Sequence, residues 1–175
     1  MALTQVTGSG ISGVTVGNFI TMVDMFRLTA TQSGGTNADI TANLERVDDA
    51  SFSKIGTGMT ESSGIFTFPT TGLYHVIYTG FIRANSDANA MLYAEVSTNS
   101  GGAFDGVGYA NAGELGSATS GSVTTASNHF FVNVTNASTF QVKFGTTSMG
   151  SGSFLEAVTD QNYTSFSFVR MGDSQ

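Results

Sequence analysis

Apolar and polar residues alternate along most of this chain with the two-residue period of β-strands. Turn-forming residues, glycine above all, separate the alternating segments, and no segment shows the caps or the period of a helix. The pattern predicts an all-β fold of roughly eight to ten strands, arranged as a two-sheet antiparallel jelly-roll sandwich. The clearest segments are residues 25–29, 64–68, 73–82, 92–96, 130–134, 140–144 and 166–170.

The strongest pattern lies between residues 64 and 82. Phe66 and Phe68 share one face of a short strand, which Pro69 ends because proline cannot donate a hydrogen bond to a ladder. We expect this strand to form a hairpin with the strand over residues 73–82.

The strand over residues 73–82 is apolar on both faces, and such a strand must be covered on both faces. One row of its side chains is Tyr74, Val76, Tyr78 and Ile82, and the opposite row is Leu73, Ile77 and Phe81. The first row, together with apolar residues of the other predicted strands, is expected to form the hydrophobic core. The residues expected to be largely buried are Phe66, Phe68, Tyr74, Val76, Phe130, Val132, Phe140, Val142 and Phe166.

Residues 1–23 differ from the rest, because no charge appears before Asp24 and glycines separate the apolar side chains. Such a segment cannot bury itself, so it either frays as a floppy terminus or docks on another subunit. We predict an extended attachment arm over residues 1–23 and a jelly-roll domain over residues 24–175. The arm residues expected to make contacts are Val6, Ile11, Val14, Val16, Phe19 and Ile20.

The composition limits the kinds of partner that this chain could bind. Only 11% of the 175 residues are charged, against about 25% in an ordinary soluble domain, so much of the surface must be Ser, Thr, Asn and Gly. The net charge of −7 and the scattered basic residues leave no patch for nucleic acid. Cysteine is absent, and neither a signal segment nor a stretch long enough to span a membrane is evident.

Candidate chemistry is sparse. The two histidines, His75 and His129, lie on strand faces opposite the aromatic row and have no carboxylate within a few residues. The pair Asp48 and Asp49 could offer oxygen atoms to calcium, but calcium takes six or more and no loop supplies them at a recognisable spacing. We therefore expect no catalytic residue, no metal and no cofactor, and we expect that the protein is not an enzyme.

The stretch SSGIFTFPTTGLYHVIYTGFI, residues 62–82, resembles the trimeric jelly-roll family that includes tumour necrosis factor and the globular head of the complement subcomponent called q. The shared motif is a Gly-x-Phe strand, a proline and a Gly-x-Tyr strand, here Gly64, Phe66, Pro69, Gly72 and Tyr74. A looser likeness covers residues 24–171. The resemblance implies a homotrimer whose threefold axis is lined by apolar side chains. Those side chains would be Leu73, Ile77 and Phe81, or else the opposite row of the same strand.

A Gly-, Ser-, Thr- and Asn-rich domain of this kind also resembles versions found in virion proteins of tailed bacteriophages. That likeness implies a homotrimeric capsid decoration protein in the virion, attached through its arm to the major capsid protein. The alternative is the tip domain of a tail fibre or spike that binds a host surface receptor. An enzyme acting on host polysaccharide would need two carboxylates at a defined distance, and no pair in the sequence fits that role.

Overall fold

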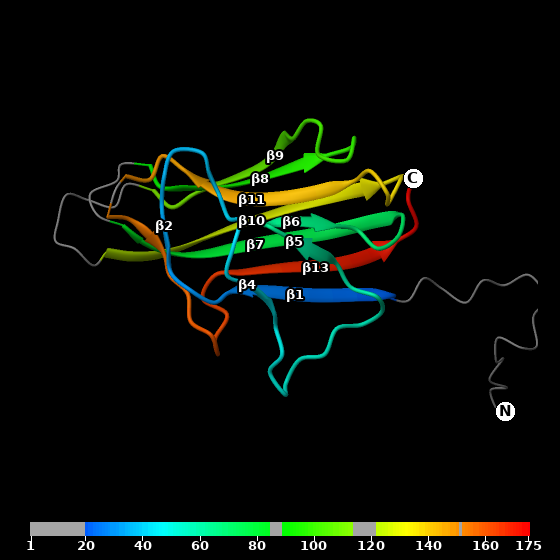
Figure 1. Cartoon of the computed structure of the whole chain (residues 1–175), viewed down its shortest axis with the longest axis horizontal. Helices are drawn as coiled ribbons and strands as arrows, with labels where there is room; N and C mark the ends of the chain where they lie inside the picture. Colours follow the sequence, from blue (N-terminus) through cyan, green and yellow to red (C-terminus); the bar gives the residue numbers. More distant parts are fainter. Residues whose placement is uncertain (1–19, 85–88, 114–121, 151) are drawn as a thin grey trace, which may run out of the picture.

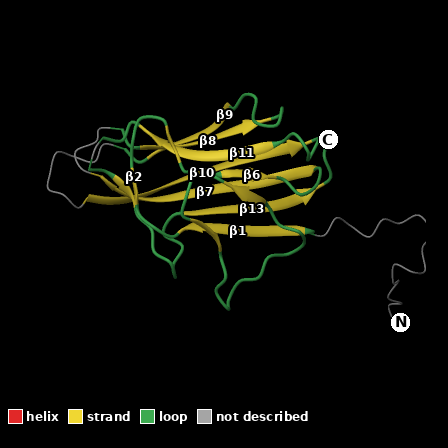
Figure 2. Cartoon of the chain, in the orientation of Figure 1, coloured by secondary structure: helices red, strands yellow, loops and turns green. Residues whose placement is uncertain are grey.

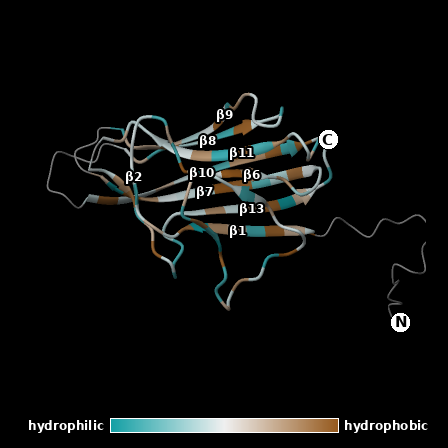
Figure 3. Ribbon diagram, in the orientation of Figure 1, coloured by the Kyte–Doolittle hydropathy of each residue, from teal (hydrophilic) through white to brown (hydrophobic). Residues whose placement is uncertain are grey.

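The computed structural model describes residues 20–84, 89–113, 122–150 and 152–175, and these form thirteen strands and no helix (Figure 2). The alternation seen in the sequence follows the strands, with hydrophobic and hydrophilic positions interleaved along β1 and β13 (Figure 3). The strands are β1 (Met22–Leu28), β2 (Gln32–Ser33), β3 (Ala38–Asp39), β4 (Leu44–Arg46), β5 (Thr60–Ser62), β6 (Ile65–Thr67), β7 (Gly72–Ala84), β8 (Met91–Ser97), β9 (Asp105–Asn111), β10 (Ser122–Val134), β11 (Gln141–Thr147), β12 (Phe154–Leu155) and β13 (Ser165–Gly172).

Two antiparallel sheets form the sandwich (Figure 1). The seven-stranded sheet has the order β2-β12-β7-β13-β1-β4, with β10 paired to β7. The six-stranded sheet has the order β5-β6-β11-β8-β9, with β3 paired to β11. This confirms the predicted all-β, two-sheet jelly roll.

The two longest strands, β7 and β10, pair along their whole length, and β10 lies at the edge of the seven-stranded sheet while β7 also pairs with β13 and β12 on its other side. β1 begins at Met22, two positions before the expected start of the domain, and pairs there with Arg170 near the end of β13. The beginning of β1 and the C-terminus therefore lie at the same end of the sandwich (Figure 1).

Aromatic side chains fill the space between the sheets. Phe66 of the six-stranded sheet lies against Phe26 and Phe168 of the other sheet, with ring centroids 5.1 and 5.2 Å apart. The row Tyr74, Val76, Tyr78 and Ile82 is fully buried in this core. Every residue predicted to be largely buried is so, except Phe140, which precedes β11 and is only partly buried against the core.

The expected hairpin between residues 64–68 and 73–82 is wrong. β6 pairs with β5 and β11 in the six-stranded sheet, while β7 lies in the other sheet. The short connection through Pro69 therefore crosses from one sheet to the other. This crossing lets Phe68 and Tyr74 approach across the core, with ring centroids 4.8 Å apart.

A tight turn at Ser63 and Gly64 joins β5 to β6, and both residues have positive φ angles, 52° and 83°. A side chain at Gly64 would place its Cβ 1.9 Å from the backbone oxygen of Ile40. The turn consequently lies directly against the segment that follows β3, and this contact fixes one wall of the hollow described below.

Candidate functional site

The outer face of the seven-stranded sheet carries the three residues predicted for a subunit interface. Leu73, Ile77 and Phe81 alternate with the buried row of β7, so they point away from the core, and each is half-buried. The opposite row is enclosed within the sandwich, so it cannot contact another copy. Of the two rows of β7 that the sequence offered for the subunit interface, only the row of Leu73, Ile77 and Phe81 is available to contact another copy.

An aromatic cluster adjoins these residues on the neighbouring strand β10. Phe131 is 63% exposed, and its ring stacks on the imidazole of His75 with centroids 4.8 Å apart. The rings of His75 and His129 have centroids 5.7 Å apart. Val123, near the start of β10, is 54% exposed on the same face. Exposed apolar groups that gather on one face commonly mark an interaction surface.

This outer face carries no charge along its centre. Neither residues 73–81 of β7 nor residues 123–133 of β10 include an Asp, Glu, Lys or Arg. Arg83 lies at one end of this face and pairs with Glu156, while Arg170, on the core-facing row of β13, pairs with Asp173 at 2.7 Å at the opposite end of the sheet. Depletion of charge at the centre with charged residues at the rim is typical of protein interfaces.

The sequence reasoning placed His75 and His129 correctly on the face opposite the core, but it missed Phe131 and Val123. The signal was available in the alternation of β10, whose buried row of Phe130 and Val132 leaves Phe131 pointing outward. Among the described residues, neither imidazole makes a hydrogen bond or an ion pair with a carboxylate. The two histidines therefore lack the partner that would orient a general base.

The predicted attachment arm is described only at its end. Ile20 precedes β1 and is 51% exposed. The other predicted arm residues, Val6, Ile11, Val14, Val16 and Phe19, lie outside the described residues.

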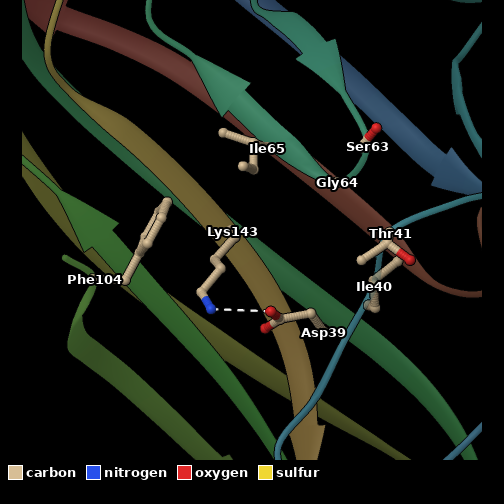
Figure 4. Close-up of a pocket in the computed structure, with 8 residues that line it drawn as sticks. All are labelled: Asp39, Ile40, Thr41, Ser63, Gly64, Ile65, Phe104 and Lys143. Carbon is tan, nitrogen blue, oxygen red and sulfur yellow. Dashed lines mark hydrogen bonds and ion pairs between the residues drawn. The ribbon is translucent and has the colours of Figure 1, made fainter. Parts of the chain in front are cut away.

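A second surface lies on the outer face of the six-stranded sheet, where a hollow of about 200 Å³ opens between β3, the β5–β6 turn, β11 and the segment before β9 (Figure 4). The side chain of Lys143 crosses it toward Asp39 (Figure 4). The residues that line it are Asp39, Ile40, Thr41, Ser63, Gly64, Ile65, Phe104 and Lys143.

Lys143 is held by two carboxylates and one aromatic ring. Its Nζ lies 3.0 Å from Asp39 Oδ2 and 3.1 Å from Glu95 Oε2, and 4.9 Å from the centre of the Phe104 ring. Partial burial by itself would lower the pKa of Lys143, but the hydrogen bonds with both carboxylates outweigh it and raise the pKa. The lysine therefore stays charged and keeps the carboxylates in fixed positions.

Two tyrosines extend this cluster along the sheet. Tyr93 donates its hydroxyl to Asp39 Oδ1, and both burial and this hydrogen bond raise its pKa, so the phenol stays protonated. Gly145 makes room for the ring, because a Cβ at that position would lie 2.3 Å from it. Tyr109, directly opposite Tyr93 on β9, is 60% exposed.

The pair Asp48 and Asp49 has a structural role. Both carboxylates accept hydrogen bonds from the guanidinium of Arg27, at 2.7 and 2.8 Å. The Arg27 side chain is only 3% exposed, so these acids satisfy a cation that would otherwise be buried alone. Among the described residues, no three His, Asp or Glu side chains gather as a metal ion would require.

Comparison with known proteins identifies the fold. No family model matches the chain, and no curated protein matches its sequence. A solved structure of Eiger TNF from S. frugiperda superposes with a TM-score of 0.70 at 10% identity, covering 90% of this chain and 96% of that one. A crystal structure of murine APRIL at pH 5.0 gives 0.63 at 9% identity, covering 86% and 98%. The described part of the chain contains no helix with the length and apolarity of a membrane span. At these identities the likeness establishes the fold alone: the chain is a jelly roll of the tumour necrosis factor type.

Proposed function

We propose that this chain is a non-enzymatic structural protein that assembles as a homotrimer through the outer face of its seven-stranded sheet. The observation that carries the proposal is the exposed cluster around Phe131, which continues into the predicted interface residues Ile77 and Phe81 without an intervening charge.

The energetics favour self-association of this face. Removing a large apolar side chain from water contributes about 1.5–3 kcal/mol, and Phe131 and Val123 are each more than half exposed in the single chain. In a closed symmetric assembly every subunit buries the same apolar residues. The free energy gained by burying each residue is therefore counted once for every subunit. Residues 73–81 and 123–133 carry no Asp, Glu, Lys or Arg, so assembly through these two stretches would bury none of these charges.

Among non-enzymatic structural proteins, we propose that this chain is a capsid decoration protein of a virion. The support is the resemblance of this Gly-, Ser-, Thr- and Asn-rich domain to virion proteins of tailed bacteriophages, together with residues 1–23 as an attachment arm. An apolar extended arm gains most by adding a strand to the sheet edge of another protein, here the major capsid protein. Three arms on one trimer would bind together, so weak individual contacts sum to firm attachment.

The alternative is the receptor-binding tip of a tail fibre or spike. The observation that favours it is the hollow of the six-stranded sheet, where the ring of Phe104 lies near the fixed carboxylate of Asp39, while the exposed Tyr109 lies opposite Tyr93 on the same sheet. Such a surface suits recognition of a small ligand, which a purely cementing role does not need.

Two measurements test the proposal. Analytical ultracentrifugation of the full chain should give the mass of three subunits, and a monomer would overturn the assembly. Immunogold labelling of purified particles should then place the protein on the shell in many copies. Labelling confined to the tail would favour the receptor-binding alternative.

A further inference from the structure

We propose that the hollow on the outer face of the six-stranded sheet binds one neutral sugar ring of a glycan. This site lies within a single chain, so it does not depend on the proposed trimer. It gives the six-stranded sheet a binding function of its own, separate from the assembly surface on the other side of the sandwich.

The first argument is the combination of side chains. One face of a pyranose ring presents C–H groups that pack on aromatic rings, while its hydroxyls need hydrogen-bond partners. Phe104 and Ile65 supply apolar surface on two sides of the hollow, and the carboxylate of Asp39 lies between them and the opposite wall (Figure 4). Ligand sites of this kind are apolar with a few placed polar groups.

The second argument is that the polar groups are fixed before any ligand arrives. Asp39 is held by Lys143 and by the hydroxyl of Tyr93, and Lys143 is also held by Glu95. A site whose polar groups are already ordered binds without the entropic cost of ordering them. Carboxylates in such positions retain lone pairs that can accept hydrogen bonds from sugar hydroxyls.

The third argument concerns free hydroxyls at the rim. Thr41 and Ser63 are both exposed at the hollow, and neither hydroxyl is hydrogen-bonded to another described residue. Their backbone positions are nevertheless fixed, because the turn at Gly64 packs on the backbone of Ile40. These two hydroxyls can donate to or accept from a ligand without breaking a contact of the protein.

Charge and size define the ligand class. Asp39 and Glu95 outnumber Lys143, and the whole chain carries a net charge of −7, so an anionic sugar or a phosphate is repelled. The volume of about 200 Å³ is below the roughly 300–1,000 Å³ of pockets for drug-sized ligands. It suits a single ring, with the exposed ring of Tyr109 available to the next unit of a chain.

Saturation-transfer difference NMR on the full chain tests this with glucose, galactose, mannose and N-acetylglucosamine, and with glucuronic acid and N-acetylneuraminic acid as anionic probes. We expect at least one neutral sugar to bind and the acidic sugars to bind more weakly. Absence of binding by all four neutral sugars, or a preference for the acidic ones, would overturn the proposal.

Variants locate the site. Phe104→Ala should weaken binding about tenfold, which corresponds to about 1.4 kcal/mol, and the double variant Thr41→Ala with Ser63→Ala should weaken it severalfold. The matched control Ile55→Ala removes an exposed apolar side chain outside the hollow and should leave binding unchanged. Equal binding by wild type and Phe104→Ala would place the sugar elsewhere and refute the site. Ultracentrifugation of the same samples reports trimer assembly separately, so failure of one proposal does not imply failure of the other.

Discussion

The imidazole of His75 stacks on the ring of Phe131, with ring centroids 4.8 Å and planes 25° apart, on the outer side of the seven-stranded sheet. The two residues are direct partners in the pairing of β7 with β10. Aromatic pairs across strands stabilise a sheet, yet here Phe131 remains mostly exposed in the single chain. The pair therefore joins the predicted interface row of β7 to a larger apolar surface that a further copy can cover.

Ile77→Asp should abolish the trimer. Ile77 lies at the centre of this face, directly opposite His129 in the pairing with β10. The substitution would place three like charges near one axis without partners, and an unpaired buried charge costs several kcal/mol. Analytical ultracentrifugation should show a folded monomer. The control is Val107→Asp, which adds the same charge at an exposed position of β9 and should remain trimeric. An Ile77→Asp trimer as stable as wild type would remove this face from the interface.

Phe68→Ala should reduce the free energy of unfolding by about 3–5 kcal/mol, the usual range for truncating a buried phenylalanine. Phe68 is 2% exposed and packs edge-on against Tyr74 across the core. Urea denaturation followed by circular dichroism measures the change. Tyr109→Ala, at an exposed position, should change stability by only about 0.5 kcal/mol. Similar losses in both variants would contradict the assigned core.

Stability should fall as the pH rises above about 10, the ordinary range of tyrosine titration. Burial raises the pKa of Tyr78, and burial with the hydrogen bond to Asp39 raises that of Tyr93. Both phenols therefore keep their protons in the folded chain after the unfolded chain has lost them, so the folded state loses relative stability with rising pH. Lys143, whose pKa is also raised, acts in the same direction.

Urea midpoints at pH 8 and pH 11 measure this effect. Tyr93→Phe should lower stability at pH 8 because it removes the hydrogen bond to Asp39, and it should also reduce the further loss between pH 8 and pH 11. Tyr109→Phe, at an exposed position, is the control and should keep the wild-type pH dependence. A midpoint that stays constant up to pH 11 would contradict the raised pKa values.

Deletion of residues 2–18 should leave a folded trimer that no longer joins the particle. β1 begins at Met22 and pairs with β13 from Met22 to Arg27, so the deletion removes no described strand. Co-sedimentation of the truncated protein with undecorated particles measures attachment, with the full chain as the control. Equal decoration by both proteins would place the attachment surface on the jelly roll itself.

The alternation of residues by itself determined the fold class and the two faces of β7. Because successive side chains of a strand point to opposite sides, Tyr74 and Val76 had to share one face and Leu73 and Ile77 the other. The same local rule could not identify which strand lies beside which. The hairpin expected around Pro69 failed for this reason, since a turn signal marks a break in a strand but not the sheet that the next strand enters.

Only the tertiary structure assembled the hollow on the six-stranded sheet. Asp39, Glu95, Phe104 and Lys143 come from four separate segments, and none of them belongs to a local motif. β9 is also absent from the segments with clear alternation, because both its faces are largely exposed and its glycines interrupt the pattern. Local patterning follows from the geometry of one strand, whereas a site of this kind depends on long-range pairing that packing of the whole sandwich decides.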